Sequence, residues 1–117
     1  MDKQKERKIF TLLRDMGISP SLRGYDYLKF AIEVTMTDRT LVHSMVKKLY
    51  PCIADYFGTT PIRVERDMRT AIESAWSKGM NESQEQLFGN IISPSKGKPT
   101  NAEFIGTVVE FLILNEE

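Results

Sequence analysis

The sequence has one cysteine, one histidine and no long apolar run, and each scarcity excludes a class of protein. Cys52 alone cannot form an internal disulfide, which fits a reducing cytoplasm. His43 has no second histidine or cysteine at ligand spacing, so we expect neither a metal site nor a His-activated nucleophile. No segment approaches the roughly 18 apolar residues of a membrane span. We therefore expect a cytoplasmic chain that is not an enzyme, uses no cofactor and does not enter a membrane.

A net charge is also absent, because 16 basic residues balance 16 acidic ones. Many nucleic-acid binders are strongly basic, so any affinity for DNA has to come from local clusters of positive charge. The length of 117 residues suits one domain with its own hydrophobic core. We expect a single domain over residues 1–117.

Apolar residues recur at helical spacing along most of the chain, and glycines, prolines and capping residues separate the segments. The predicted helices before the centre of the chain cover residues 3–16, 24–37 and 39–49. Pro51 follows, and a proline costs about 3 kcal/mol in a helix interior, so we expect a kink or break near residues 48–50. The apolar stripe of the third helix consists of Leu41, Val42, Met45, Val46 and Leu49.

Two further helices are predicted near the end of the chain. Residues 82–88 form a short helix with Asn81 as its cap, and its polar face consists of Glu82, Gln84, Glu85 and Gln86. Thr100 and Glu103 form a capping box that starts the last helix. That helix is too apolar for a free surface helix, so it either packs into the core or partly meets a partner subunit.

The central segment has the layout of a helix-turn-helix motif. Pro51 can open a helix, because its missing N–H would be unpaired there anyway. Gly58 follows at the place where a left-handed residue commonly ends a helix. Thr60 suits an N-cap and Pro61 the first helical position of a second helix. A helix-turn-helix is therefore predicted over about residues 51–78.

The second helix of this motif has an apolar side and a charged side. The apolar side consists of Val64, Met68, Ala71, Ile72 and Ala75. Arg66 points almost directly away from it, and the residues around Arg66 are Ile62, Arg63, Arg69, Thr70 and Glu73. Arginine can grip a guanine or a phosphate through two N–H groups. The pattern indicates DNA recognition, and a solvated face of an ordinary helix is the alternative interpretation.

A second basic cluster lies in the loop before the last helix. Lys96 and Lys98 flank Gly97 within a segment rich in proline and serine. Two lysines so placed can lie along a phosphate backbone, while a solvated loop explains the same residues equally well.

Several unusual strings resemble a known family. They are GYDYLKFAI at 24–32, LYPCIADYFGTTPIRVER at 49–66, AIESAWSKG at 71–79, LFG at 87–89 and GKPTNAEFI at 97–105. Together they resemble the C-terminal effector domain of the stage zero sporulation protein A family of bacterial endospore formers. The resemblance implies an all-α fold of about six helices with a DNA-binding helix-turn-helix, and one long bent helix around Pro51.

The resemblance also implies roles for particular residues. The helix matching residues 61–79 enters the major groove, with Arg63, Glu65, Arg66 and Arg69 facing DNA and Lys98 on the backbone. A surface near residues 81–88 would meet the RNA polymerase sigma factor, and two copies would occupy adjacent half-sites as a homodimer. The candidate DNA-binding residues are Ile62, Arg63, Glu65, Arg66, Arg69, Thr70, Lys96 and Lys98.

Four positions depart from the family pattern. Ile62 stands for a serine, Asp67 for an alanine, Thr70 for a histidine and Asp55 for a lysine. Each change makes the DNA side less positive or more apolar, and the family's receiver domain has no counterpart in this chain. We expect a sequence-specific transcription regulator that binds double-stranded DNA. The alternative is a protein–protein adaptor with a degenerate DNA-binding surface.

Overall fold

The computed structural model describes residues 2–92 and 97–116, and within those ranges it contains helices and connectors but no strand. The elements in chain order are α1 (Lys3–Asp15), α2 (Arg23–Thr37), a 3-10 helix η1 (Arg39–His43), a π-helix η2 (Met45–Leu49), α3 (Tyr50–Phe57), α4 (Pro61–Trp76), α5 (Glu82–Phe88) and α6 (Asn101–Leu114). The predicted all-α class with about six helices is confirmed. None of the described helices has both the length and the apolar composition that a membrane crossing requires.

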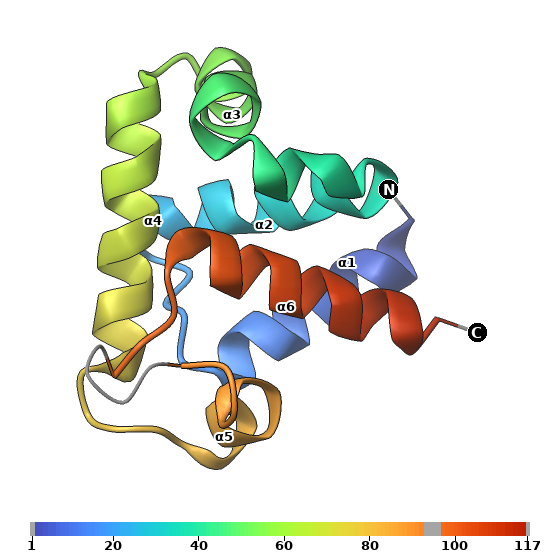
Figure 1. Cartoon of the computed structure of the whole chain (residues 1–117), viewed down its shortest axis with the longest axis vertical. Helices are drawn as coiled ribbons and strands as arrows, with labels where there is room; N and C mark the ends of the chain where they lie inside the picture. The colour runs from blue at the N-terminus through green and yellow to red at the C-terminus, as the bar shows by residue number, and fades with distance from the viewer. Residues whose placement is uncertain (1, 93–96, 117) are drawn as a thin grey trace.

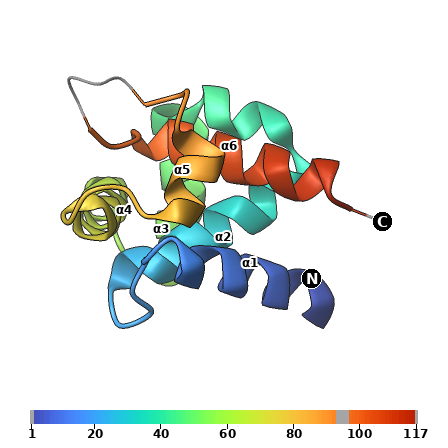
Figure 2. The same ribbon diagram turned by 90° about the horizontal axis from the view of Figure 1, so that it is seen from below.

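The helices are arranged around α2, which packs against both α4 and α6. In Figure 1, α4 stands upright at one side, α3 lies at its upper end and α5 lies toward its lower end. Figure 2 shows the same molecule from below, with α4 viewed along its axis. In both views the two ends of the chain lie on the side away from α4. Neither chain end lies beside α4, and its residues Arg63, Arg66 and Thr70 are exposed to solvent.

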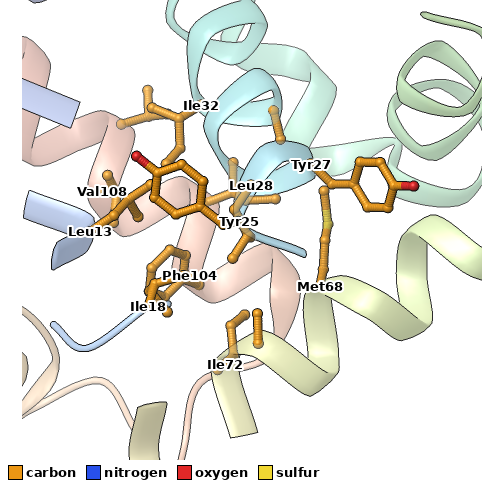
Figure 3. Close-up of a cluster of buried hydrophobic side chains, with 14 of the residues drawn as sticks. Leu13, Ile18, Tyr25, Tyr27, Leu28, Ile32, Met68, Ile72, Phe104 and Val108 are labelled. Carbon is orange, nitrogen blue, oxygen red and sulfur yellow. The ribbon is translucent and has the colours of Figure 1, made fainter. Parts of the chain in front are cut away.

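The hydrophobic core joins four helices at one place (Figure 3). Side chains less than 2% exposed come from α1 and the connector after it, α2, α4 and α6: Leu13, Ile18, Leu28, Ile32, Met68, Ile72, Phe104 and Val108. Burying one such side chain is worth roughly 1.5–3 kcal/mol. The inner face of α4 is thus held firmly, and the side of the helix that faces away from this core is positioned with it.

The first turn of α2 touches the backbone of α4. A Cβ built at Gly24 would lie 2.1 Å from the carbonyl oxygen of Asp67 and 2.7 Å from the Cβ of Ala71. No side chain fits in that space, so glycine is what lets the two helices approach. The contact fixes the start of α2 beside the middle of α4.

The local signals around the turn between α3 and α4 act as predicted. Gly58 has φ 68° and ends α3 in the left-handed conformation. The Thr60 side chain accepts a hydrogen bond from the backbone N–H of Arg63 at 3.3 Å, and a proline occupies the first turn of α4. The capping boxes led by Asn81 and Thr100 are both present. The starts of α4, α5 and α6 are therefore encoded locally.

The kink or break predicted near residues 48–50 is not a break: the winding changes there from π-helix to α-helix, and the chain leaves the helical region earlier, at Ser44. Ser44 has φ −136° and ψ 50°, outside the helical region, and it separates the 3-10 helix from the π-helix. From there the chain stays helical through Tyr50 and into α3. Pro51 lies in the first turn of α3, after a wide turn in which Leu49 N–H donates to the Ser44 carbonyl. A wider turn relieves the clash between a proline ring and the carbonyl four residues earlier.

The apolar stripe predicted for residues 39–49 is also partly wrong. Leu49 is buried, but Val46 is 77% exposed. The predicted stripe assumes an α-helix with 3.6 residues per turn, whereas this segment winds first as a 3-10 helix and then as a π-helix. The changed winding rotates Val46 out of the core.

Candidate nucleic-acid interface

The outer side of α4 carries most of the residues predicted to meet DNA. Val64 and Met68 point into the core and are fully buried, so the opposite side of the helix faces solvent. Five predicted residues are exposed: Ile62, Arg63, Arg66, Arg69 and Thr70. Glu65 is half-buried. The structure therefore brings six of the eight candidates onto one helix face, with two clefts beside it.

The first cleft lies at the start of α4 and is called here the turn cleft. It is lined by Arg23, Tyr27, Phe57, Gly58, Thr59, Arg63, Arg66 and Asp67. Arg23 comes from α2, outside the helix-turn-helix segment, and the sequence prediction missed it. Only the close approach of Gly24 to α4 brings Arg23 here, and no spacing in the sequence indicates that contact.

Aromatic rings hold α2 against α3 on one side of the turn cleft. Tyr27 meets Phe57 edge to face, with ring centroids 5.2 Å apart. Phe30 stacks on Tyr56 at 4.4 Å. Such pairs add about 0.5–1.5 kcal/mol each beyond the area they bury. The cleft therefore has a rigid wall that connects α2 to the turn.

The turn cleft has an excess of positive charge. Arg66 Nε lies 3.7 Å from Asp67 Oδ1, a loose ion pair. Among residues 2–92 and 97–116, no ion pair within 4.0 Å includes Arg23 or Arg63. Three arginines thus face one carboxylate, and two of the three are free of an acidic partner in the described chain.

The second cleft lies where α6 begins beside the middle of α4, and is called here the α6 cleft. Its lining is Tyr50, Glu65, Arg69, Ile72, Lys98, Pro99, Thr100, Asn101 and Ala102. Arg69 Nε donates to Glu65 Oε2 at 3.0 Å, and Lys98 Nζ lies 3.5 Å from Glu73 Oε2. The hydrogen bond from Arg69 to Glu65 raises the pKa of the guanidinium above its ordinary value. Both cations of the α6 cleft are therefore paired.

A buried amide joins α6 to α4 inside the α6 cleft. Asn101 Nδ2 donates to the Tyr50 hydroxyl at 3.0 Å and to the backbone carbonyl of Glu65 at 3.1 Å. Burial raises the pKa of the Tyr50 hydroxyl above its ordinary value. The sequence predicted only a capping box in this part of the chain. It did not indicate the contacts of Asn101, because they join residues that are 51 and 36 positions apart in the sequence. Asn101 fixes the end of the loop that carries Lys98.

The predicted loop cluster of Lys96 and Lys98 is only partly placed. Lys96 lies outside the described residues. Lys98 is half-buried against α4, as its contact with Glu73 requires. The loop end therefore lies beside the same helix as the arginines, near the middle of the helix and away from its start.

The predicted polar face of α5 needs one correction. Gln84 is fully buried, and its Nε2 donates to the carbonyls of Met16 at 2.7 Å and Ala75 at 3.0 Å. These carbonyls lie near the ends of α1 and α4, where backbone acceptors lack helical partners. Gln84 therefore connects three helices, and the exposed polar residues of α5 are Glu82, Glu85 and Gln86.

Within residues 2–92 and 97–116, no group of three or more histidine, cysteine, aspartate or glutamate side chains is arranged to hold a metal ion. The polar groups that the two clefts gather are arginines, lysine, hydroxyls and carboxylates. Such groups can bind phosphate and base edges by charge and hydrogen bonding.

The chain matches a family model described as the C terminal of the sporulation initiation factor Spo0A, over residues 9–112. This match covers nearly the whole chain and includes both clefts. The chain therefore belongs to the family of Spo0A C-terminal domains, which is a family of DNA-binding regulatory domains and not of enzymes.

Proposed function

We propose that this member of the Spo0A C-terminal family binds duplex DNA in a sequence-specific manner and regulates transcription, with α4 in the major groove. The observation that carries the proposal is the exposed side of α4, whose first two turns present Arg63 and Arg66 beside the turn. Recognition helices contact base edges with the residues of their first turns. A chain without net positive charge needs its cations concentrated in this way.

The residues at the start of α4 suit particular contacts. Arg66 is exposed and only loosely paired with Asp67, so its guanidinium is available to the O6 and N7 of a guanine. Ile62 is 77% exposed, and a thymine methyl is its natural partner. Arg63 and Thr70 are exposed on the same side and would contact the backbone or a neighbouring base.

Glu65 and Arg69 act as a pair in this proposal. A carboxylate can accept from cytosine N4, but Glu65 already accepts from Arg69. The pair would present one acceptor and one cation to neighbouring positions of the duplex. Lys98 would approach the backbone beside the middle of α4. Lys96 is proposed as a second backbone contact on its sequence position alone.

Two kinds of partner are proposed, one from the family membership and one from the exposed face of α5. Two copies would occupy adjacent half-sites on DNA. The exposed residues Glu82, Glu85 and Gln86 suit a basic partner, and the RNA polymerase sigma factor is the one we propose. Such a function would place the protein in the cytoplasm.

One observation favours a second candidate, a protein–protein adaptor that no longer reads DNA. Asp67 lies in the turn cleft, and the cations of the α6 cleft are paired with Glu65 and Glu73. Carboxylates so close to the proposed interface repel phosphates. An adaptor would retain the fold and lose specific DNA binding.

The two candidates are separated by selection from a random duplex pool. Rounds of selection are followed by binding titrations of the enriched duplex and of a scrambled duplex at several salt concentrations. The DNA-binding proposal predicts an enriched sequence that binds at least 1,000-fold more tightly than the scrambled one, on the order of known specific complexes. An adaptor would enrich no sequence and form no specific complex at any salt concentration.

A further inference from the structure

Arg23 is the one arginine of the turn cleft that does not belong to the proposed recognition helix. It is the first residue of α2, and it lines the cleft together with Arg63, Arg66 and Thr59. The helix-turn-helix segment begins well after Arg23 in the sequence. A third element, α2, therefore contributes a side chain to the cleft at the start of α4.

The fold holds Arg23 in place through its neighbour. Gly24 lies so close to α4 that an added Cβ would come within 2.1 Å of the Asp67 carbonyl oxygen. Three residues after Gly24, Tyr27 packs edge to face on Phe57 at the end of α3. The backbone at Arg23 is thus fixed against α4 on one side and, one turn on, against α3.

The chemistry of the cleft suits an anion. Arg23 and Arg63 are exposed, and no described residue pairs with either of them in an ion pair. Asp67 is the one carboxylate in the lining and is turned toward Arg66 at 3.7 Å. Guanidinium groups favour phosphate, which they can bind through two parallel N–H groups.

We propose that the turn cleft binds a backbone phosphate of duplex DNA between Arg23 and Arg63. The inference rests on the proposed function, since it assigns the contact that sets the depth and angle of α4 in the groove. Arg23 is a positioning residue here, because it reads no base. Phosphate contacts of this kind fix register and orientation without carrying sequence information.

The test uses the full chain and the duplex obtained by selection. Arg23→Ala and Arg23→Lys are titrated with the selected and the scrambled duplex over a range of salt concentrations. Arg7→Ala is the matched control, because Arg7 is an exposed arginine of α1. Figure 1 shows the start of that helix on the side of the molecule away from α4. Thermal melts of all three variants check that folding is intact.

We expect Arg23→Ala to weaken both duplexes by a similar factor of about ten and to reduce the salt slope by about one. Arg23→Lys should recover most of the slope but only part of the affinity, because lysine lacks the guanidinium fork. Arg7→Ala should leave both quantities within about twofold of the wild type, since a screened distant charge contributes little.

Three outcomes would overturn the inference, and they differ in what else they contradict. If Arg23→Ala behaves like Arg7→Ala while the wild type binds specifically, the phosphate site is wrong and the proposed function stands. If Arg23→Ala changes base preference, Arg23 reads sequence and is not a backbone contact. If the wild type itself forms no specific complex, the proposed function and the inference fail together.

A free phosphate compound offers the same chemistry as the DNA backbone, so one further arm separates them. Wild type and Arg23→Ala are titrated with inorganic pyrophosphate in the absence of DNA, with backbone and arginine N–H resonances followed by NMR. A duplex site predicts no saturable pyrophosphate binding, because two unpaired arginines hold a small anion weakly and most of the affinity comes from the rest of the duplex. Saturable binding that Arg23→Ala abolishes would assign the cleft to a soluble ligand instead.

Discussion

The turn cleft and the α6 cleft lie along the same helix and contain the same kinds of side chain, but their cations differ in availability. In the turn cleft, Arg23 and Arg63 have no acidic partner among the described residues. In the α6 cleft, Arg69 is bonded to Glu65 and Lys98 lies beside Glu73. The presence of basic residues alone therefore does not define a DNA-binding surface.

The difference indicates that the two clefts would contribute differently to the affinity for DNA. Exposed ion pairs such as Arg69–Glu65 are worth about 0–1 kcal/mol, so DNA could break them at a small cost. That cost is absent where a cation has no partner. We infer that the turn cleft anchors the duplex, while the α6 cleft adjusts affinity at the middle of α4.

The largest effect is expected where the turn cleft is built. Gly24→Ala places a Cβ within 2.1 Å of the Asp67 carbonyl oxygen, so α2 has to move away from α4. Overpacking of this kind costs about 1–3 kcal/mol, and we expect the upper end because the obstacle is backbone. Urea unfolding measures the loss in the free energy of unfolding, and the affinity for DNA should fall as well because the turn cleft is disturbed.

Gly106→Ala is the matched control for that substitution. Gly106 lies within α6, and a Cβ built there would meet only a side-chain methyl of Val42, at 3.4 Å. Alanine is favoured over glycine in helices by about 1 kcal/mol. This variant should be as stable as the wild type or more so, and equal destabilisation by both substitutions would contradict the packing argument.

The second effect concerns base recognition by Arg66. Arg66→Ala should cost about 1–3 kcal/mol on the selected duplex and relax preference at one base pair. Folding should be unaffected, because the Arg66 side chain is exposed and makes no core contact. A panel of duplexes with every base substituted singly measures the preference profile. A mutant that keeps the full profile would reduce Arg66 to a surface charge.

The third effect tests the one carboxylate of the turn cleft. Asp67→Asn keeps the shape of the side chain and removes the charge that phosphates would meet. We expect tighter binding to all duplexes by about 1 kcal/mol, the size of one unscreened charge interaction in water. Weaker binding confined to the selected duplex would mean that Asp67 accepts a hydrogen bond from a base. The sign of the change distinguishes repulsion from readout.

The smallest effect is expected in the α6 cleft. Lys98→Ala should weaken every duplex alike, but by less than about 1 kcal/mol, because Glu73 already neutralises Lys98. Glu73→Gln releases the lysine and should tighten binding by a similar amount. Binding titrations of both variants at several salt concentrations measure these changes in affinity. A loss with Lys98→Ala as large as that with Arg23→Ala would remove the distinction between the two clefts.

Much of the fold could be predicted because its signals are local. Thr60 and Pro61 start α4, Gly58 ends α3, and Thr100 caps α6, each through contacts within a few residues. The charged side of α4 could be predicted as well, since helical periodicity determines which residues lie opposite Val64.

What the sequence did not reveal depends on contacts between distant segments. The glycine contact of α2 with α4 brings Arg23 to the turn, and Gln84 is buried because it bonds two helix ends. The pairing of Lys98 with Glu73 depends on how α6 packs against α4. The misplaced break at Ser44 has a different cause, because the sequence pattern assumed α-helical winding where the chain winds otherwise.

We expect DNA to lie across the start of α4 and the first turn of α2. Amide chemical-shift perturbation with the selected duplex tests this placement directly, since every described non-proline residue has its own N–H. The largest shifts are expected at Arg23, Gly24 and Gly58–Arg66, smaller shifts near Lys98, and almost none in the first turns of α1. Shifts concentrated on α1 and the end of α6, with the turn cleft unchanged, would contradict it.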